Sequence, residues 1–565
     1  MSWRLAALLA LISTIAWPLA ASAEEGDHGD GSLGAVKHIV VIYEENHSFD
    51  NLYGGWEGVN GLSSATAAQK LQLNQAGTAL GCLLQNDLNL ASPPQPVTCT
   101  DTANAITSNF TNAPFTIDNF IKPTDTTCPA PGVFAANGVL KGAGLPGGCT
   151  RDIVHRFYQE QYQLNGGAQN RYVVGSDAVG LAMGVYSTQA LPIYAYLHQD
   201  GHPDYAIADN FFQAAFGGSF LNHQWLVAAA TPKWTSTTPP AASLQSIVDV
   251  NGFPNKNYPL YHPVTTVNDG PLTIACGSPF AGNLLCGNYA VNTIQPTFQP
   301  HALTGAQLPP LTAPTIGDRL SARGIGWAWY SGGWSNANGN VGAPGWNQLG
   351  GVCNPATTIS GAVYPNCPDK LFQFHHQAFN YYAAFDPSTK AGAANREAHL
   401  RDETEFIAAA QGSTKTCGLK PVSFVKPIGE DNEHPGYTSE STGSMHLVNL
   451  LKAIEGSRCA KDTMVVVTYD EFGGQWDHVT PPGQGGNRGP HDTSGPGTRI
   501  PALVIWRHLR DDFVVDSTSY DTTSILATIE HRYHLAPLSS RDGSVNDLSH
   551  VFRAQAPDLE GGDSR

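Results

Sequence analysis

The residues Ile39–Asp50, "IVVIYEENHSFD", change abruptly from an apolar run to two carboxylates and an amide. The continuous β-branched run predicts a buried parallel strand over His38–Tyr43, because such strands are apolar on both faces. Ligands of parallel sheets bind beyond the carboxyl ends of the strands. Glu44, Glu45 and Asn46 come at that end, although only 14% of the residues in the chain are charged. We therefore expect this stretch to set both the fold and the position of a site.

A second apolar run, Thr463–Tyr469 ("TMVVVTY"), also ends in acidic residues, Asp470 and Glu471. If the two strands are neighbours in one sheet, their ends bring several oxygen ligands to one point. Carboxylates packed this closely repel one another, and a divalent cation removes the repulsion. The sequence therefore predicts a metal site here, and two solvated loop ends with ordinary surface acids are the alternative.

Further strands and helices alternate along the chain. Ile500–Trp506 has the composition of a third buried parallel strand, and Ile325–Tyr330 is a fourth candidate. Helical patterns occur at Ile153–Leu164, Ser444–Ile454 and Thr522–Tyr533. Strands interleaved with helices predict an α/β fold, namely an α/β/α layered domain around a central, mostly parallel sheet.

The N-terminal segment has the pattern of a secretory signal peptide. Arg4 is followed by an apolar run and an A-x-A site, which predicts cleavage after residues 1–23 and a secreted or periplasmic protein. We expect a flexible tail over 24–36, one domain over 37–535, and a partly flexible C-terminal extension over 536–565. No later segment reaches the roughly 20 uninterrupted apolar residues that a membrane span needs.

Charge and cysteine content narrow the class of protein. A formal net charge of −17 argues against a nucleic-acid partner. Ten cysteines in an oxidising compartment allow five disulfides, and 59 glycines with 39 prolines indicate long loop insertions that carry them. Connectivity does not follow from sequence alone, but pairing in chain order predicts Cys82–Cys99, Cys128–Cys149, Cys276–Cys286, Cys353–Cys367 and Cys417–Cys459.

Ser219 follows two glycines in "NFFQAAFGGSFLNHQWLVAAATP" and opens a helical pattern. A helix N-terminus favours phosphate, although an ordinary N-cap serine is the alternative. The chain also has 20 histidines. Each one alone is more often a surface or structural residue, and only their presence together with the acidic strand ends indicates a site. The histidines of interest are His155, His375, His376, His434 and His478.

Four segments resemble a known family in collinear order. They are "IVVIYEENHSFDNLYG", "VVVTYDEFGGQWDHVTPP", "GPGTRIPALVIW" and "DTTSILATIEHRY". They are similar to motifs of the bacterial phosphoesterase family that holds phospholipases C and secreted acid phosphatases of the AcpA type. The resemblance runs from about Lys37 to about Tyr533 and implies an alkaline-phosphatase-like α/β/α fold, with 37–535 as the catalytic domain.

The resemblance also implies roles for individual residues and a divalent metal ion of unspecified identity and number. The family's metal-ligand positions match Glu45, Asn46, Asp470 and Glu471, the last of which is Asp in some members. The nucleophile position matches Ser219. The phosphate-contacting positions match His155, His375, His376 and His434.

The resemblance implies a secreted, metal-dependent acid phosphatase that hydrolyses phosphate monoesters through a phosphoserine intermediate. Protonated histidines around the phosphate would give an acidic pH optimum. The alternatives are a phospholipase C acting on phospholipid head groups and a catalytically silent binding protein. Many phospholipase members have G-P-T-x-P-N-R around the nucleophile, whereas this chain has "GGSFLNHQW". That departure favours small phosphate-ester substrates.

Overall fold

The computed structural model describes ten stretches of the chain, which are residues 33–87, 90, 95–121, 150–254, 256–265, 269–276, 284–298, 306–346, 372–412 and 416–557. The predicted signal peptide lies outside these residues, as do the predicted pairs Cys128–Cys149 and Cys353–Cys367. Among the described helices, none is long and apolar enough to cross a membrane.

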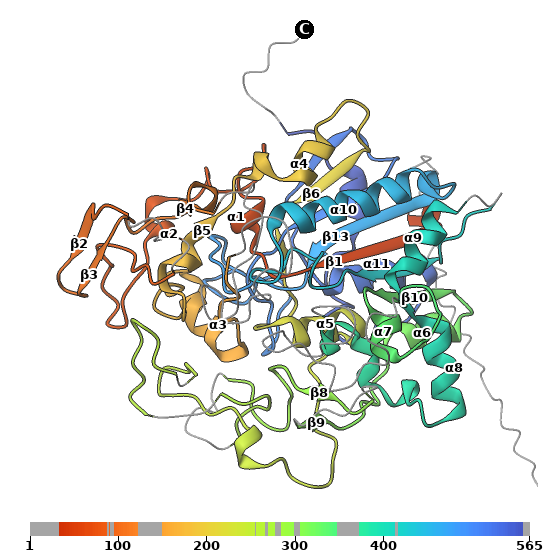
Figure 1. Cartoon of the computed structure of the whole chain (residues 1–565), viewed down its shortest axis with the longest axis horizontal. Helices are drawn as coiled ribbons and strands as arrows, with labels where there is room; N and C mark the ends of the chain where they lie inside the picture. Colours follow the sequence, from red (N-terminus) through yellow and green to blue (C-terminus); the bar gives the residue numbers. More distant parts are fainter. Residues whose placement is uncertain are drawn as a thin grey trace, which may run out of the picture.

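An eight-stranded sheet forms the centre of the molecule, in the order β11-β10-β12-β1-β13-β14-β6-β15 (Figure 1). Its strands are β1 His38–Glu44, β6 Tyr205–Ala208, β10 Trp327–Ser331, β11 Leu400–Asp402, β12 Val422–Lys426, β13 Thr463–Tyr469, β14 Ala502–Ile505 and β15 Phe513–Asp516. All of them except β14 run in one direction, so the prediction of a mostly parallel sheet is confirmed.

The direction predicted for Ile500–Trp506 is wrong. Its core, β14, is antiparallel to both β13 and β6. A continuous apolar run reports burial on both faces but carries no information on direction. No helix lies between β13 and β14, and a loop without a crossover suits an antiparallel neighbour.

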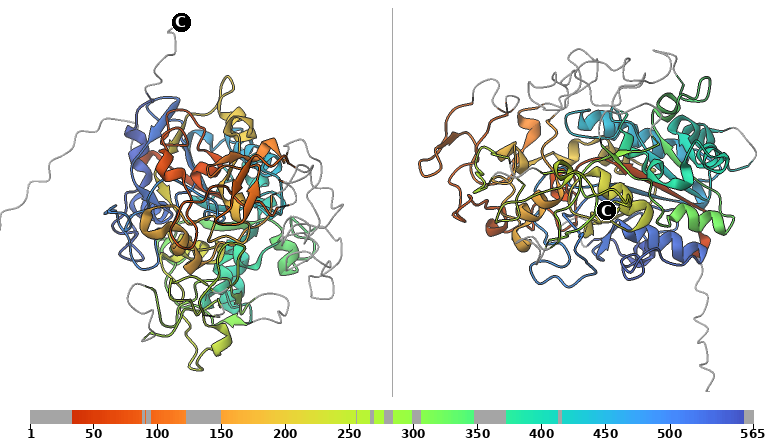
Figure 2. Two further views of the ribbon diagram at one scale, coloured as in Figure 1. Left: turned by 90° about the vertical axis from the view of Figure 1, so that its left-hand side faces the viewer. Right: turned by 90° about the horizontal axis from the view of Figure 1, so that it is seen from below.

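Helices cover both faces of the sheet. The helices are α1 Phe49–Leu52, α2 Ala67–Lys70, α3 Phe157–Leu164, α4 Pro192–Leu197, α5 Ser219–Ala228, α6 Ile316–Ala322, α7 Trp334–Asn338, α8 Lys390–His399, α9 Glu403–Gln411, α10 Glu440–Glu455 and α11 Thr523–Tyr533. Helix α10 packs against α4 and α9, whereas α5 packs against α6 and α11. The right-hand view of Figure 2 shows α10 and α11 on opposite sides of the sheet, which confirms the α/β/α layers.

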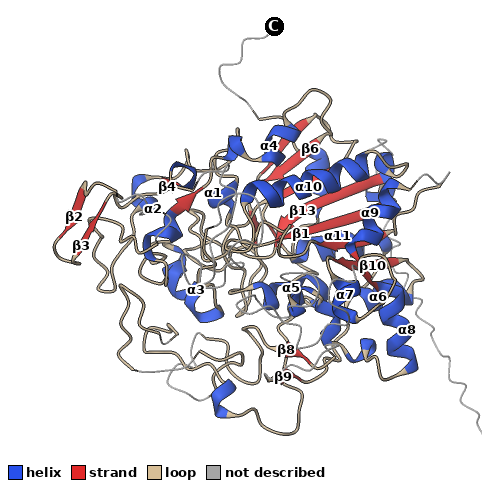
Figure 3. Ribbon diagram, viewed as in Figure 1, coloured by secondary structure: helices blue, strands red, loops and turns tan. Residues whose placement is uncertain are grey.

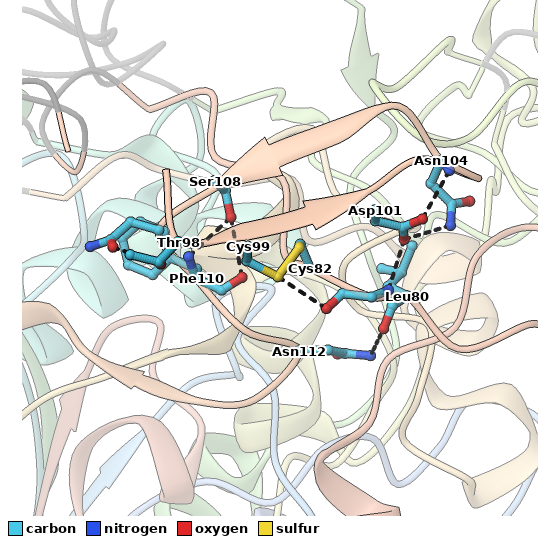
Figure 4. The surroundings of a disulfide bond; sticks show 11 residues. Leu80, Cys82, Thr98, Cys99, Asp101, Asn104, Ser108, Phe110 and Asn112 are labelled. Atoms are coloured by element: carbon cyan, nitrogen blue, oxygen red, sulfur yellow. Dashed lines mark hydrogen bonds between the residues drawn. A yellow bond between two sulfur atoms is a disulfide. The ribbon is translucent and has the colours of Figure 1, made fainter. Parts of the chain in front are cut away.

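The loop insertions carry short strands outside the main sheet (Figure 3). These strands are β2 Cys99–Asp101, β3 Ile106–Ser108, β4 Phe115–Thr116, β5 Gly184–Val185, β7 Phe211–Phe212, β8 Gln295–Pro296, β9 Gln307–Leu308 and β16 Tyr520–Asp521. The β2–β3 hairpin is tied by the Cys82–Cys99 disulfide, and the Asp101 carboxylate accepts hydrogen bonds from Asn104 (Figure 4). The predicted bonds Cys276–Cys286 and Cys417–Cys459 are also formed.

The two strands with acidic ends are direct neighbours, which is the condition for their ends to meet at one point. Strand β1 pairs in parallel with β13, and Glu44 lies opposite Tyr469. The backbone N–H of Asp470 then donates to the carbonyl of Glu44, at 3.1 Å. This register places Glu45 and Asp470 beside each other, just beyond the carboxyl edge of the sheet.

Candidate active site

A cavity of about 670 Å³ opens beyond this edge of the sheet. Its walls bring together five residues from distant parts of the sequence. All five were predicted as the nucleophile and its phosphate-contacting partners, and they are Ser219, His155, His375, His376 and His434. The structure therefore places these candidates around a single space.

Ser219 is the first residue of α5, and a tight glycine turn presents it to the cavity. Gly217 has a φ of +88°, and a Cβ there would lie 2.6 Å from the backbone nitrogen of Phe157. Only glycine fits this approach. The side chain of Asn222 fixes the turn, since it accepts from the N–H of Ala215 and donates to the carbonyl of Gly217, at 3.0 and 3.2 Å. The serine hydroxyl is thus held at a helix N-terminus, which favours anions.

The four predicted metal ligands surround the Ser219 hydroxyl. Its Oγ lies 3.1 Å from Glu45 Oε2, 3.4 Å from Glu471 Oε1 and 3.5 Å from Asn46 Oδ1. Asp470 completes the group, because its Oδ1 accepts from the backbone N–H of Asn46 at 3.2 Å. Asn46 adopts a positive φ of 62°, a conformation that asparagine tolerates better than most residues.

These four side chains fit a divalent cation. They offer carboxylate and amide oxygens, the ligands that hard cations prefer. The Oδ2 atom of Asp470 is buried and has no hydrogen-bond partner among the described residues. Burial raises the pKa values of Asp470 and Glu471 well above their ordinary range, and the nearby carboxylates raise them further. A bound cation would remove this penalty on the charged forms.

Glu45 differs from Asp470 and Glu471 because the positive charges near it outweigh the effect of burial on its pKa. Burial alone would raise the pKa of Glu45, but two cations more than offset it and hold that pKa well below its usual range. They are His376, which is charged only in acid, and Lys426. The ammonium of Lys426 lies 2.6 Å from Glu45 Oε1, and both side chains are fully buried. Glu45 is therefore ionised before any metal binds.

Two residues of this site, Lys426 and His223, were not predicted from the sequence. Lys426 could have been noticed because it is a lysine at the end of an otherwise apolar strand, "VSFVK". His223 lies one turn after Ser219 on α5, where its Nδ1 donates to the Ser219 carbonyl at 2.7 Å. Its ring stacks on His376 with centroids 5.1 Å apart.

The histidines of the cavity differ from the expectation that they are positively charged. Burial lowers the pKa of His376 to about 4 and also lowers the pKa values of His375 and His434. These imidazoles are therefore neutral in the substrate-free site at neutral pH. His434 uses this state, since its Nε2 accepts a hydrogen bond from Asn46 Nδ2 at 3.0 Å.

His478, which also stood out in the sequence, lies outside the cavity. Its Nδ1 is 2.5 Å from Asp50 Oδ2. The fully buried Arg499 joins this group by contacting Asp50 and Asp477, at 3.0 and 3.1 Å. This cluster holds the segments after β1 and β13 together. Its contacts are those of a structural ion-pair cluster.

Comparisons with known proteins identify the family of this chain. The model of the Phosphoesterase family matches residues 36–536. Phospholipase C A of Mycobacterium tuberculosis strain H37Rv is 24% identical over 559 residues, covering 93% of this chain and 79% of that protein. Phospholipase C B of the same strain is 23% identical over 576 residues, covering 96% and 82%.

A solved structure of a protein in the alkaline phosphatase superfamily from Vibrio parahaemolyticus is also similar. It is 11% identical, covers 66% of each chain and has a TM-score of 0.27. The family assignment rests on the sequence model, which matches most of the chain from the first strand of the sheet to the helix α11. On that match, this protein belongs to the Phosphoesterase family.

Proposed function

We propose that this phosphoesterase hydrolyses phosphate monoesters with Ser219 as its nucleophile. The observation that carries the proposal is the position of Ser219 Oγ. It lies within 3.5 Å of Glu45, Asn46 and Glu471 and faces the cavity from a helix N-terminus. A hydroxyl in this setting combines what covalent phosphoryl transfer needs, namely a nucleophile, a charge to activate it and donors for the phosphate oxygens.

A divalent cation held by Glu45, Asn46, Asp470 and Glu471 would, when bound, lower the pKa of the serine hydroxyl and offset the charge on the phosphate. The chain's own groups do the rest. Ser219 Oγ attacks phosphorus in line, the bond to the leaving alcohol breaks, and a phosphoserine forms. Water then breaks the Oγ–P bond and restores the serine.

The cavity histidines position the phosphate in this scheme. His155, His375, His376 and His434 all line the cavity, and an imidazole N–H is a donor for a non-bridging phosphate oxygen. Neutral His375 and His376 act as hydrogen-bond donors rather than as resident charges. His434 already donates through Nδ1 to the Pro435 carbonyl and accepts at Nε2 from Asn46, so it can donate to a phosphate oxygen only once it is protonated. An anionic phosphate placed among them raises their pKa values and draws protons into the site.

Phospholipase C activity is the second candidate, and the relatives named above favour it. The size of the cavity, about 670 Å³, leaves room for more than a phosphate group, and Tyr258 and Tyr437 line it. Against it stands the sequence at the nucleophile, where no arginine follows Ser219 in "GGSFLNHQW". A catalytically silent binding protein is the third candidate, and the intact arrangement around Ser219 speaks against it.

A substrate panel tests the proposal. The purified protein, with and without a chelator, is assayed from pH 4 to 9 on p-nitrophenyl phosphate, bis-p-nitrophenyl phosphate and phosphatidylcholine vesicles. We expect the monoester to give the highest kcat/KM and the chelator to abolish turnover. Faster cleavage of phosphatidylcholine would assign the protein to the second candidate instead. We also propose export with a mature chain that begins at Glu24, and N-terminal analysis of the exported protein checks this.

A further inference from the structure

We propose that the ammonium of Lys426 takes the place of a second metal ion beside Glu45, so that the site holds one divalent cation. This inference rests on the proposed function, because it takes the oxygen cluster around Ser219 to be the metal site. It assigns to Lys426 the role of a positioning residue that holds Glu45 Oε1, so that Glu45 Oε2 is directed at that cation.

Lys426 is held in one place by two short contacts. It is the last residue of β12, the strand beside β1. Its side chain is fully buried, and its Nζ lies 2.6 Å from Glu45 Oε1 and 2.8 Å from the carbonyl oxygen of Tyr43. The two oxygens of Glu45 therefore face different partners, since Oε2 lies toward Ser219 Oγ at 3.1 Å.

Apart from the Lys426 ammonium, the groups around Glu45 Oε1 are donors that could hold a metal ion. His376 Nε2 lies 3.1 Å from this oxygen and His223 Nε2 lies 3.9 Å from it. One ligand atom from each of these three residues lies within 4.8 Å of the other two, and all three are buried. His223 donates through Nδ1 to the Ser219 carbonyl, so its Nε2 carries the lone pair that a metal would use.

Charge balance favours one metal ion. Glu45, Asp470 and Glu471 supply three negative charges when all are ionised, and one divalent cation with one ammonium balances them. A second divalent cation at Glu45, His223 and His376 would share Glu45 Oε1 with the buried ammonium. A metal ion and an ammonium that contact the same carboxylate oxygen repel each other strongly where little water screens their charges. Lys426 thus excludes a metal from a set of donors that could otherwise hold one.

Metal stoichiometry tests the inference. The full mature chain is loaded with Zn²⁺ or Mn²⁺ and gel-filtered, and metal per chain is measured by inductively coupled plasma mass spectrometry. We expect the wild type to saturate at one ion and Lys426→Met to bind two zinc ions, because the carboxylate and imidazole donors are then free. Lys426→Arg, which keeps the charge, should stay at one. Adding His376→Ala to Lys426→Met should return the count from two to one.

Two outcomes overturn the inference. One is a wild type that binds two ions, and the other is a folded Lys426→Met variant that still binds one ion with unchanged affinity. Circular dichroism checks that each variant folds. If Lys426→Met does not fold, the number of metal ions bound by the wild type can still overturn the inference. The readout is independent of turnover, so a protein with one ion but no phosphatase activity would reject the proposed function and leave this inference standing.

Discussion

Replacing Glu45 with glutamine removes a negative charge that we expect to contact both the Lys426 ammonium and the divalent metal ion. Lys426 Nζ lies 2.6 Å from the carboxylate in a fully buried setting, so Glu45→Gln leaves a buried ammonium without its ion-pair partner. Breaking a buried pair in this way costs about 3–5 kcal/mol. Loss of an outer-shell partner lowers metal affinity about 10–100-fold, and loss of a direct ligand should exceed about 100-fold.

The neighbouring residue offers a matched control. Glu44 is also fully buried, but it points to the opposite face of the strand, where Glu433 lies near it. Burial, and then Glu433, raise the pKa of Glu44 well above its ordinary range, which favours the neutral form of its carboxyl group. Glutamine resembles a neutral carboxylic acid in shape, and Glu44→Gln should change stability by less than about 1 kcal/mol.

Urea unfolding in the presence of a chelator measures the stability effect alone, and isothermal titration with Mn²⁺ or Zn²⁺ measures the metal effect. We expect Glu45→Gln to lower both the free energy of unfolding and the metal affinity. Glu44→Gln should match the wild type in both quantities. Equal losses in the two variants, or a loss confined to Glu44→Gln, would show that Glu45 is not the residue of this pair that faces the metal site.

Two further predictions concern stability away from the cavity. His446 Nε2 lies 2.8 Å from Glu403, and although burial opposes it, Glu403 raises the pKa of His446 to about 9. A histidine whose pKa is higher in the folded than in the unfolded protein stabilises the fold fully below its unfolded pKa of about 6.5, and this stabilisation is lost as the pH rises through the folded pKa of about 9. The difference in the free energy of unfolding between wild type and His446→Gln should therefore shrink by about 3 kcal/mol over this pH range. A pH-independent difference in thermal unfolding would contradict this. Arg499→Met should cost about 3–5 kcal/mol, because it leaves Asp50 and Asp477 buried without their cation, and an unchanged urea midpoint would refute that role.

The parts of the fold that could be predicted from sequence are those fixed by local pattern. The apolar runs before Glu45 and Asp470 indicate buried strands, and the structure pairs them as neighbours. The direction of β14 could not be predicted in this way, because burial on both faces gives the same composition to parallel and antiparallel strands.

The candidate site was predictable where motifs carry it and not where packing does. Ser219 and its oxygen-bearing neighbours lie in recognisable segments. Lys426 comes from a strand with no motif of its own, and only the order of strands in the sheet places it beside Glu45. The neutral state of His376 is likewise invisible in sequence, since its pKa is set by how deeply the fold buries it.

We expect Ser219 to carry the phosphoryl group during turnover. Rapid acid quench of the protein turning over p-nitrophenyl phosphate, followed by peptide mass spectrometry, reads this out directly. We predict phosphate on the peptide that contains Ser219, and in Ser219→Ala no phosphopeptide and a kcat reduced at least about 10³-fold with an unchanged circular dichroism spectrum. Phosphate on another residue, or normal turnover in Ser219→Ala, would contradict the account.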